Sequence, residues 1–178
     1  MTTLASEVDQ RARGIRLLVL DVDGVLTDGR LYYGGDEVEL KAFHIQDGHG
    51  LKMLRESGIE IAIITGRTSQ AVERRAQNLG VQYVYQGVAD KLAVFEELLA
   101  SLGVGATAAA GMGDDLPDLP ILRRCGLAVT VPEAPALIRS HAHYVTSLHG
   151  GSGAVREVCE LLMQAQGTLE GKMQEYLR

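Results

Sequence analysis

Two short segments of the chain carry closely spaced carboxylates. The first reads Asp21-Val22-Asp23-Gly24, and the second reads Gly113-Asp114-Asp115, with Asp118 one helical turn after Asp114. Carboxylates that lie close together repel one another unless a cation sits between them, and a site with oxygen ligands alone favours Mg²⁺. If the fold brings the two segments together, they therefore predict a magnesium site.

A hydroxyl and two cations stand at comparable places in the chain. Thr65-Gly66-Arg67 follows an apolar run, and Lys91 stands at the start of an expected helix. A magnesium ion with a lysine beside it forms a site for an anion, and phosphate is the anion that fits. The pattern therefore indicates chemistry on a phosphorylated compound.

Each of these features also has an ordinary structural explanation. Asp21-Val22-Asp23-Gly24 is compatible with a solvated turn, and Thr65-Gly66-Arg67 with a helix cap and turn. Lys91 is compatible with a surface lysine, and Gly113-Asp114-Asp115 with a helix N-cap. Their order favours function, because they stand in sequence at or near the ends of successive expected strands. The carboxyl ends of such strands meet at the edge where open α/β sheets bind ligands.

Short apolar runs alternate with helical runs along most of the chain. The apolar runs predict parallel strands buried on both faces, at residues 17–20, 59–64, 81–85, 106–110 and 127–131. The helical runs between them are residues 47–57, 69–79, 89–102 and 115–124. The glycines that follow these helices, where left-handed caps favour glycine, are Gly58, Gly80, Gly103 and Gly126. The alternation predicts an α/β fold with a Rossmann-like, doubly wound parallel sheet.

One segment departs from this alternation. Residues 30–33 and 37–43 have a strand-like pattern on either side of Gly34-Gly35-Asp36, which predicts a β-hairpin with a glycine-rich turn. Because it follows the first strand, this flap is expected to lie over the carboxyl end of the sheet. The whole chain, 1–178, is expected to form a single domain, with a core over about 15–165 and a polar, mobile tail over about 166–178.

The composition excludes several classes of protein. Of 178 residues, 46% are hydrophobic and 22% are charged, which indicates a globular domain rather than a disordered or fibrous chain. The formal net charge of −6 argues against nucleic acid or an anionic membrane as the main partner. No apolar run approaches the ~20 residues of a membrane span, and the N-terminus lacks the apolar stretch of a signal peptide. With two cysteines and no metal-ligand spacing, we expect a reduced, cytoplasmic protein.

The four motifs resemble those of the haloacid dehalogenase superfamily of phosphotransferases, over residues 17–131. A closer resemblance is to the 3-deoxy-D-manno-octulosonate 8-phosphate phosphatase family, which lacks a cap domain. It rests on residues 20–29 (LDVDGVLTDG), 43–48 (FHIQDG), 64–67 (ITGR) and 150–157 (GGSGAVRE). The family implies Mg²⁺ as cofactor, a phosphorylated sugar acid as substrate, a role in lipopolysaccharide synthesis and a Gram-negative source. It also implies a homotetramer in which the hairpin reaches a neighbouring subunit.

The resemblance implies a role for each catalytic residue. Asp21 would attack the phosphorus and form an aspartyl-phosphate. Asp23 would protonate the leaving alkoxide and then take a proton from water, while only its backbone carbonyl contacts Mg²⁺. Asp114 would join Asp21 as a carboxylate ligand of the metal. Thr65 would hydrogen-bond a phosphoryl oxygen, and Lys91 would neutralise charge there.

The remaining motif residues have supporting roles in this scheme. Gly24 lets the chain turn sharply beneath the phosphoryl group. Gly66 and Arg67 would bind substrate, since the guanidinium can grip a carboxylate or a phosphate, although a helix-surface role for Arg67 stays open. One of Asp115 and Asp118 is expected to orient a water on the metal, and the other to hold the motif lysine.

Two other functions stay open at this point. The catalytic motifs do not distinguish the octulosonate from a related nine-carbon sugar acid phosphate, because pocket shape makes that choice. A non-catalytic, phosphate-accepting module also carries an Asp cluster, a Thr and a Lys on a parallel sheet. Its acceptor Asp follows the third strand, however, whereas Asp21 and Asp23 follow the first. A catalytically inactive scaffold would be expected to lose Asp21 or Asp23, and both are present.

Overall fold

The computed structural model describes residues 4–35 and 38–177, and its main sheet has six parallel strands. The order across the sheet is β5-β4-β1-β6-β7-β8. The strands are β1 Leu17–Leu20, β4 Glu60–Ile64, β5 Tyr83–Tyr85, β6 Ala109–Met112, β7 Leu127–Thr130 and β8 Tyr144–Val145. β1, β6 and β7 are buried over their whole length, as strands covered on both faces should be.

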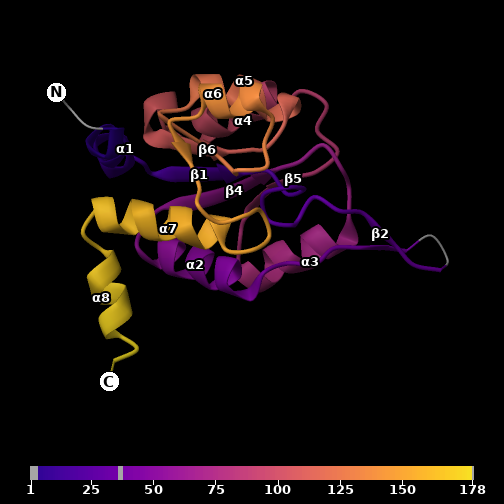
Figure 1. Cartoon of the computed structure of the whole chain (residues 1–178), viewed down its shortest axis with the longest axis horizontal. Helices are drawn as coiled ribbons and strands as arrows, with labels where there is room; N and C mark the ends of the chain where they lie inside the picture. Colours follow the sequence, from indigo (N-terminus) through magenta and orange to yellow (C-terminus); the bar gives the residue numbers. More distant parts are fainter. Residues whose placement is uncertain (1–3, 36–37, 178) are drawn as a thin grey trace.

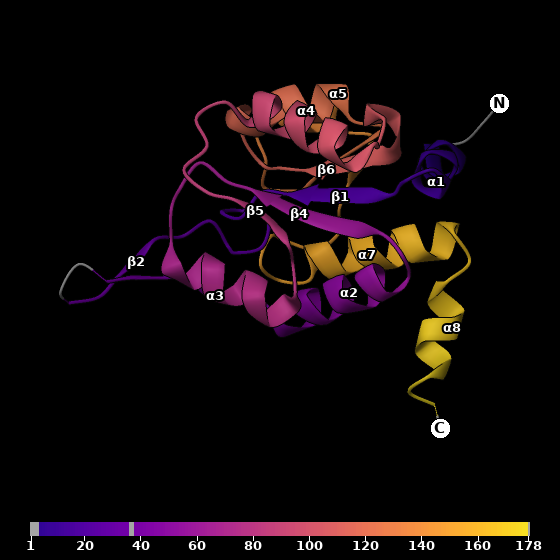
Figure 2. The ribbon, with the colours of Figure 1, turned by 180° about the vertical axis from the view of Figure 1, so that it is seen from behind.

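Helices cover both faces of this sheet, as Figures 1 and 2 show. The helices on one face are α2 Ile45–Glu56, α3 Gln70–Leu79 and α7 Ala154–Ala165. Those on the other face are α4 Lys91–Leu102, α5 Leu119–Arg124 and α6 Ala136–His141. The N-terminal helix α1 (Leu4–Arg13) packs against α7. The predicted doubly wound α/β fold is therefore confirmed.

β1 lies at the point where the chain reverses its progress across the sheet. From β1 the chain moves outward through β4 to β5, and it then returns to the other side of β1 as β6. Open sheets bind ligands at such a reversal, outside the carboxyl ends of the strands. Asp21, Thr65 and Gly113 directly follow β1, β4 and β6. The topology therefore brings three of the four sequence motifs to one place.

The strands differ from the expected ones in their bounds and in one additional strand. Those expected at 59–64, 81–85 and 127–131 are shorter by one or two residues. The strand expected at 106–110 is β6, which begins at Ala109, and Ala106–Ala108 forms a short 3-10 helix instead. Pairing explains the shift, because Ala109 pairs with Leu17 and β1 thereby sets the register. The sixth strand, β8, was not expected, since its two residues form no apolar run.

The helices also differ in detail from the expected ones. The helix expected at 115–124 is divided into a 3-10 turn (Leu116–Asp118) and α5, and prolines stand near the start of both. Helices α1 and α6 were not expected. Gly126 is not among the glycines with positive φ, so the expected left-handed cap is wrong there. A Cβ at Gly126 would instead overlap the Thr107 carbonyl, so close backbone approach requires this glycine.

A two-stranded hairpin projects from the body of the molecule (Figure 1). It consists of β2 (Tyr32–Tyr33) and β3 (Glu39–Leu40), which pair antiparallel with Tyr33 opposite Glu39. Both strands are shorter than the sequence pattern predicted. The expected turn at 34–36 includes Asp36, which together with Glu37 lies outside the described residues.

The C-terminal tail, expected as polar and mobile, contains the short helix α8 (Leu169–Gln174). The tail contacts α2 at two places. Lys172 Nζ donates a hydrogen bond to Glu56 Oε2 at 3.1 Å, and the rings of Tyr176 and His49 meet edge-on with centroids 5.4 Å apart. The composition of the tail predicted neither the helix nor these contacts. None of the helices within the described ranges is long and apolar enough to cross a membrane.

Candidate active site

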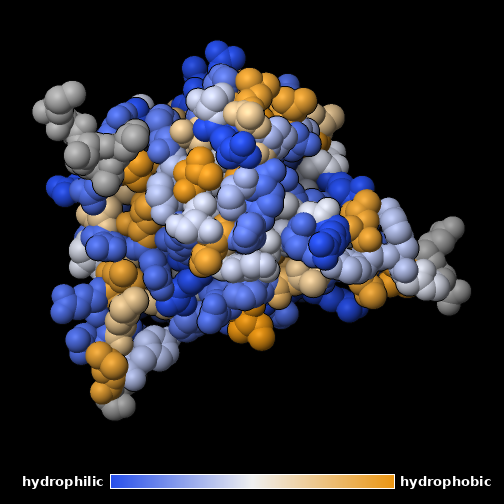
Figure 3. Space-filling model, viewed as in Figure 1, coloured by the Kyte–Doolittle hydropathy of each residue, from blue (hydrophilic) through white to orange (hydrophobic). Residues whose placement is uncertain are grey.

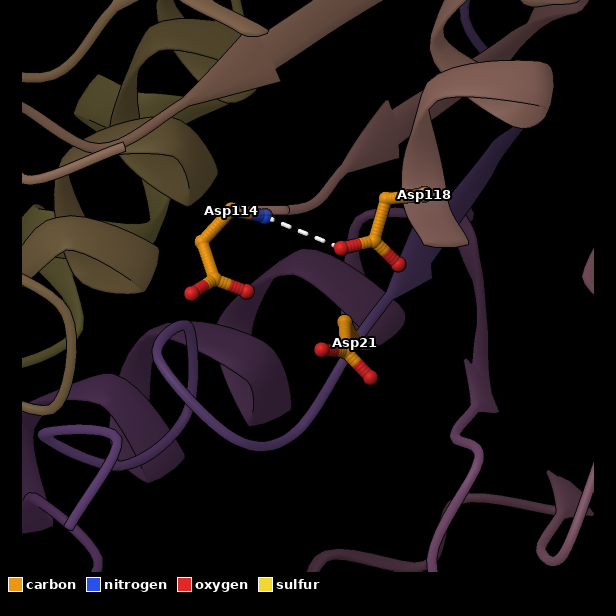
Figure 4. Close-up of side chains that lie close together, drawn as sticks. All are labelled: Asp21, Asp114 and Asp118. Atoms are coloured by element: carbon orange, nitrogen blue, oxygen red, sulfur yellow. Dashed lines mark hydrogen bonds between the residues drawn. The ribbon is translucent and has the colours of Figure 1, made fainter. Parts of the chain in front are cut away.

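Three carboxylates meet beyond the carboxyl ends of β1 and β6 (Figure 4). Asp21 directly follows β1, Asp114 lies two residues after β6, and Asp118 ends the 3-10 turn that comes next. One oxygen of each carboxylate lies within 4.8 Å of the other two. We call these three residues the acidic cluster. The fold thus brings the two acidic segments together.

Lys91 lies beside the acidic cluster, at the first position of α4. Its Nζ donates a hydrogen bond to Asp21 Oδ1 at 2.8 Å and another to Asp118 Oδ1 at 2.6 Å. Burial lowers the pKa of Lys91, but the two carboxylates outweigh burial, so the pKa is raised overall and the ammonium stays charged. Of the two later aspartates, Asp118 is therefore the one that holds Lys91.

The electrostatics and chemistry of the acidic cluster fit a divalent cation. Burial, together with the charge of Asp118, raises the pKa of Asp21 to about 6. Burial, with the charges of Asp118 and Asp21, raises the pKa of Asp114 to about 7. The ionised cluster has three carboxylates and only one lysine beside it, so it carries a net negative charge. The donors are all carboxylate oxygens, which suit Mg²⁺, Ca²⁺ or Mn²⁺ rather than softer metals.

Asp118 also shapes the loop between β6 and α5. Its Oδ2 accepts hydrogen bonds from the backbone N–H of Asp114 at 3.1 Å, drawn in Figure 4, and of Asp115 at 3.2 Å. Asp115 caps the 3-10 turn, since its Oδ1 accepts from the N–H of Leu116 at 2.8 Å. The Asp115 side chain is exposed and does not belong to the acidic cluster. The contacts that the structure gives Asp115 are therefore those of a helix cap.

Gly24 and Thr65 occupy tightly constrained positions at the same edge. Gly24 has a φ of 91°, and a Cβ there would overlap the Asp114 carboxylate. Only glycine lets the loop after β1 pass this close to Asp114. Thr65 is buried, and its backbone N–H donates to the Tyr85 carbonyl at 2.9 Å. The next two residues, Gly66-Arg67, are exposed.

Asp23 lies outside the acidic cluster, among a different set of charges. Its Oδ1 accepts a hydrogen bond from Lys41 Nζ, and its Oδ2 is 3.9 Å from Arg67 Nε. Glu39 contacts both of these cations, with its Oε1 3.2 Å from Lys41 Nζ and its Oε2 accepting a hydrogen bond from Arg67. The expectation that Asp23 would offer a metal only its backbone carbonyl is compatible with this side-chain position.

Sequence reasoning did not identify Lys41 or the contacts of the Gly150 loop. Lys41 is a single lysine at the end of the expected hairpin, and no motif marked it. Gly150 packs so closely on the loop after β1 that a Cβ would overlap the Gly24 carbonyl, and Gly151 N–H donates to the Val25 carbonyl at 2.9 Å. The GGSG stretch is a local pattern, and a local pattern carries no information about such a distant contact.

Relatives of known family resemble the chain over almost its whole length. The 3-deoxy-D-manno-octulosonate 8-phosphate phosphatase of Yersinia pestis is 50% identical over 168 residues, which are 94% of this chain and 90% of that protein. The chain belongs to the 3-deoxy-D-manno-octulosonate 8-phosphate phosphatase family. The resemblance found in the motifs is thereby confirmed. A family model described as haloacid dehalogenase-like hydrolase also matches residues 83–158, which include Lys91 and the second acidic segment.

Solved structures of this phosphatase family have the same fold. The enzyme from Moraxella catarrhalis, in complex with a magnesium ion, a phosphate ion and a KDO molecule, has a TM-score of 0.94 and 44% identity, covering 96% of this chain and 98% of that one. A probable YrbI family phosphatase from Pseudomonas syringae has a TM-score of 0.95 and 51% identity, covering 97% and 98%. The likeness therefore extends over almost the whole chain.

Proposed function

We propose that this protein is a Mg²⁺-dependent phosphomonoester hydrolase. Its substrate would be 3-deoxy-D-manno-octulosonate 8-phosphate, and its place would be in lipopolysaccharide precursor synthesis. The observation that carries the proposal is the acidic cluster around the ammonium of Lys91, because such a site suits a metal ion and a phosphoryl group together. Support comes from the related phosphatase that was crystallised with magnesium, phosphate and KDO.

In the first half of the proposed reaction, Asp21 is the nucleophile. A carboxylate oxygen of Asp21 bonds to phosphorus while the bond from phosphorus to the sugar oxygen breaks, which divides hydrolysis into two easier displacements. Lys91, at 2.8 Å from Asp21 Oδ1, fixes the orientation of that carboxylate. Asp23 donates a proton to the sugar alkoxide as it leaves.

In the second half, Asp23 acts as the base. It takes a proton from water while the water oxygen attacks the phosphorus of the aspartyl-phosphate, and inorganic phosphate leaves as Asp21 is regenerated. Proton transfer of this kind typically contributes ~10²–10⁴-fold to the rate. Asp23 suits both steps because its carboxylate lies outside the acidic cluster.

The remaining site residues bind and orient. Asp21, Asp114 and the backbone carbonyl of Asp23 would hold Mg²⁺, which neutralises phosphoryl charge when bound. Thr65 and Lys91 would bind phosphoryl oxygens. Asp118 would act through the position of Lys91, to which it is hydrogen-bonded.

The sugar acid itself would be bound at the exposed side of the site. Gly66 and Arg67 would contact it, with the guanidinium of Arg67 facing a carboxylate. We further propose that the protein works in the cytoplasm as a homotetramer, and that the hairpin of each subunit completes the site of its neighbour.

The test is phosphate release from a panel of phosphorylated sugar acids, with Mg²⁺ and with EDTA. We expect the octulosonate 8-phosphate to give the highest kcat/KM, and EDTA to abolish turnover. Asp21→Asn should be inactive, because the amide is isosteric but forms no acyl phosphate, whereas Asp9→Asn on α1 should match the native protein. A preference for a nine-carbon acid would assign the alternative substrate. No Mg²⁺-dependent hydrolysis of any phosphomonoester would indicate a non-catalytic module.

A further inference from the structure

The proton transfers proposed for Asp23 require its carboxylate to be held away from the acidic cluster. Asp23 is separated from Asp21 by one residue, and its carboxylate must stay near the leaving oxygen rather than join the metal ligands. A carboxylate this close to a divalent cation is attracted to it. The side chain of Asp23 therefore needs a second positive charge that holds it on the substrate side.

Lys41 provides such a charge from the hairpin. It is the first residue after β3, and its Nζ donates a hydrogen bond to Asp23 Oδ1. The Lys41 side chain is only 1% exposed, and its ammonium also lies 3.2 Å from Glu39 Oε1. Lysines are almost never this buried unless they are paired, because a buried unpaired charge is costly. The Lys41 ammonium is therefore held between two carboxylates, those of Asp23 and Glu39.

Arg67 approaches the same carboxylate in a different way. Its Nε is 3.9 Å from Asp23 Oδ2, and its side chain is 46% exposed. Its short contact is with Glu39, not with Asp23. Arg67 is therefore placed to turn toward a ligand, whereas the buried ammonium of Lys41 stays on Oδ1.

We propose that Lys41 is a positioning residue for the proton transfers of Asp23. Its ammonium anchors Oδ1 and keeps the carboxylate away from the acidic cluster, so that Oδ2 exchanges the proton with the leaving oxygen and later with water. The inference rests on the proposed phosphatase function. It also assigns the hairpin a role within its own subunit, because Lys41 directly follows β3.

The test compares two substrates that differ in their need for a proton. The p-nitrophenolate anion leaves without protonation, whereas the alkoxide of a sugar phosphate requires it. In Lys41→Met we expect turnover of the sugar phosphate to fall about 10- to 100-fold, the range for loss of a hydrogen bond to a charged group, with KM nearly unchanged. On p-nitrophenyl phosphate we expect a fast burst of one p-nitrophenol per site and then slow turnover, because only the second step still needs Asp23. Asp23→Asn should show the same pattern.

Three further variants separate positioning from a general structural effect. Lys52→Met removes the same charge from an exposed position on α2 and should match the native protein. Lys41→Arg keeps a cationic donor and should recover most of the lost turnover. Thermal unfolding and circular dichroism check the fold, and Lys41→Gln takes the place of Lys41→Met if the latter does not fold.

The outcomes distinguish this inference from the function on which it rests. If the native protein hydrolyses neither substrate with Mg²⁺, the proposed function fails. If the native protein is active but Lys41→Met keeps full turnover, or loses the burst and the turnover equally, Lys41 does not position Asp23. An equal loss in Lys41→Arg and Lys41→Met would also overturn the proposal, because the charge would then be irrelevant.

Discussion

Asp21 and Asp23 are separated by one residue, yet their carboxylates have different neighbours. Asp21 lies with two other carboxylates and Lys91. Asp23 instead contacts Lys41 and is near Arg67. Different surroundings of this kind give two carboxylates different tasks. The environment of Asp21 suits a metal ligand and nucleophile, and that of Asp23 suits proton transfer.

The acidic cluster predicts how Mg²⁺ stabilises the protein at different pH. Burial and neighbouring carboxylates raise the pKa of Asp21 to about 6 and of Asp114 to about 7, from 3.8. The folded, metal-free state then binds protons at these two carboxylates more tightly than the unfolded chain does. The stability that this proton binding gives the folded state is complete below about pH 3.8. It is lost as the pH rises through 6 and 7. Mg²⁺ should offset that loss, because it binds the ionised carboxylates.

The measurement is the midpoint of thermal unfolding at pH 5 and at pH 8, with MgCl₂ or with NaCl of equal ionic strength. We expect the larger Mg²⁺-dependent rise at pH 8, corresponding to about 2.7 kcal/mol when Mg²⁺ is at 100 times its Kd. Asp114→Asn should lose most of the rise, and Asp9→Asn should keep it. Equal rises at both pH values would count against these carboxylates as the Mg²⁺ ligands.

Among the secondary structure elements, α2 and α7 are joined by a carboxylate that caps a helix other than its own. The N-cap of α7 is Gly153, which has no side chain to accept a hydrogen bond. Asp47 of α2 replaces it, since its Oδ1 accepts from Arg156 N–H at 2.8 Å and its Oδ2 from Gly153 N–H at 3.3 Å. The buried Asp47 thereby fixes the start of α7, and with it the Gly150 loop that packs on Gly24.

Removing this cap should destabilise the fold. We expect Asp47→Ala to lower the free energy of unfolding by about 1–3 kcal/mol, because one buried and one partly buried N–H group lose their acceptor. Asp90→Ala, which removes the exposed N-cap of α4, is the matched control and should cost about 1 kcal/mol. Urea unfolding measures both. A smaller loss for Asp47→Ala than for Asp90→Ala would show that burial adds nothing to this cap.

At the scale of the whole molecule, the projecting hairpin leaves several apolar side chains exposed in a lone subunit. Apolar side chains gather along it in Figure 3. Tyr33 is 70% exposed, Leu40 is 56% exposed, and Ile45 at the start of α2 is 83% exposed. An isolated two-stranded hairpin is marginally stable in water, and an apolar patch of this kind marks an interface. Packing copies around a symmetry axis would cover it.

We therefore expect a homo-oligomer, and we propose a tetramer. Its assembly should depend on the apolar side of the hairpin. Leu40→Lys should shift the protein to smaller species in light scattering, because it places a charge in the interface while Glu39 and Lys41 stay intact. Leu137→Lys, on an exposed position of α6, is the control and should leave the mass unchanged. A native protein that is monomeric and fully active at micromolar concentration would contradict the expectation.

The sequence by itself determined the fold class and the motifs of the site. Continuous apolar runs indicated buried parallel strands, and the polar residues after them, such as Asp21 and Thr65, had to lie at one edge because parallel strands share their direction. That logic needs only local patterns and chain order. It was weaker for boundaries, since the register of Ala109 against Leu17 depends on a partner strand. It also could not find β8, whose two residues have no pattern of their own.

Tertiary structure decided which charges meet. Asp21 and Asp23 are separated by one residue, yet only Asp21 lies in the acidic cluster. The pairing of Lys91 with Asp118 and the contact of Lys41 with Asp23 join residues that are distant in the chain. The same holds for Gly126, whose conformation looked like a helix cap from the sequence but is set by the Thr107 carbonyl. Such contacts depend on how helices and loops pack around the sheet. Hydrophobic periodicity specifies which face of a helix or strand is buried, but it does not specify which side chain of another element lies opposite that face.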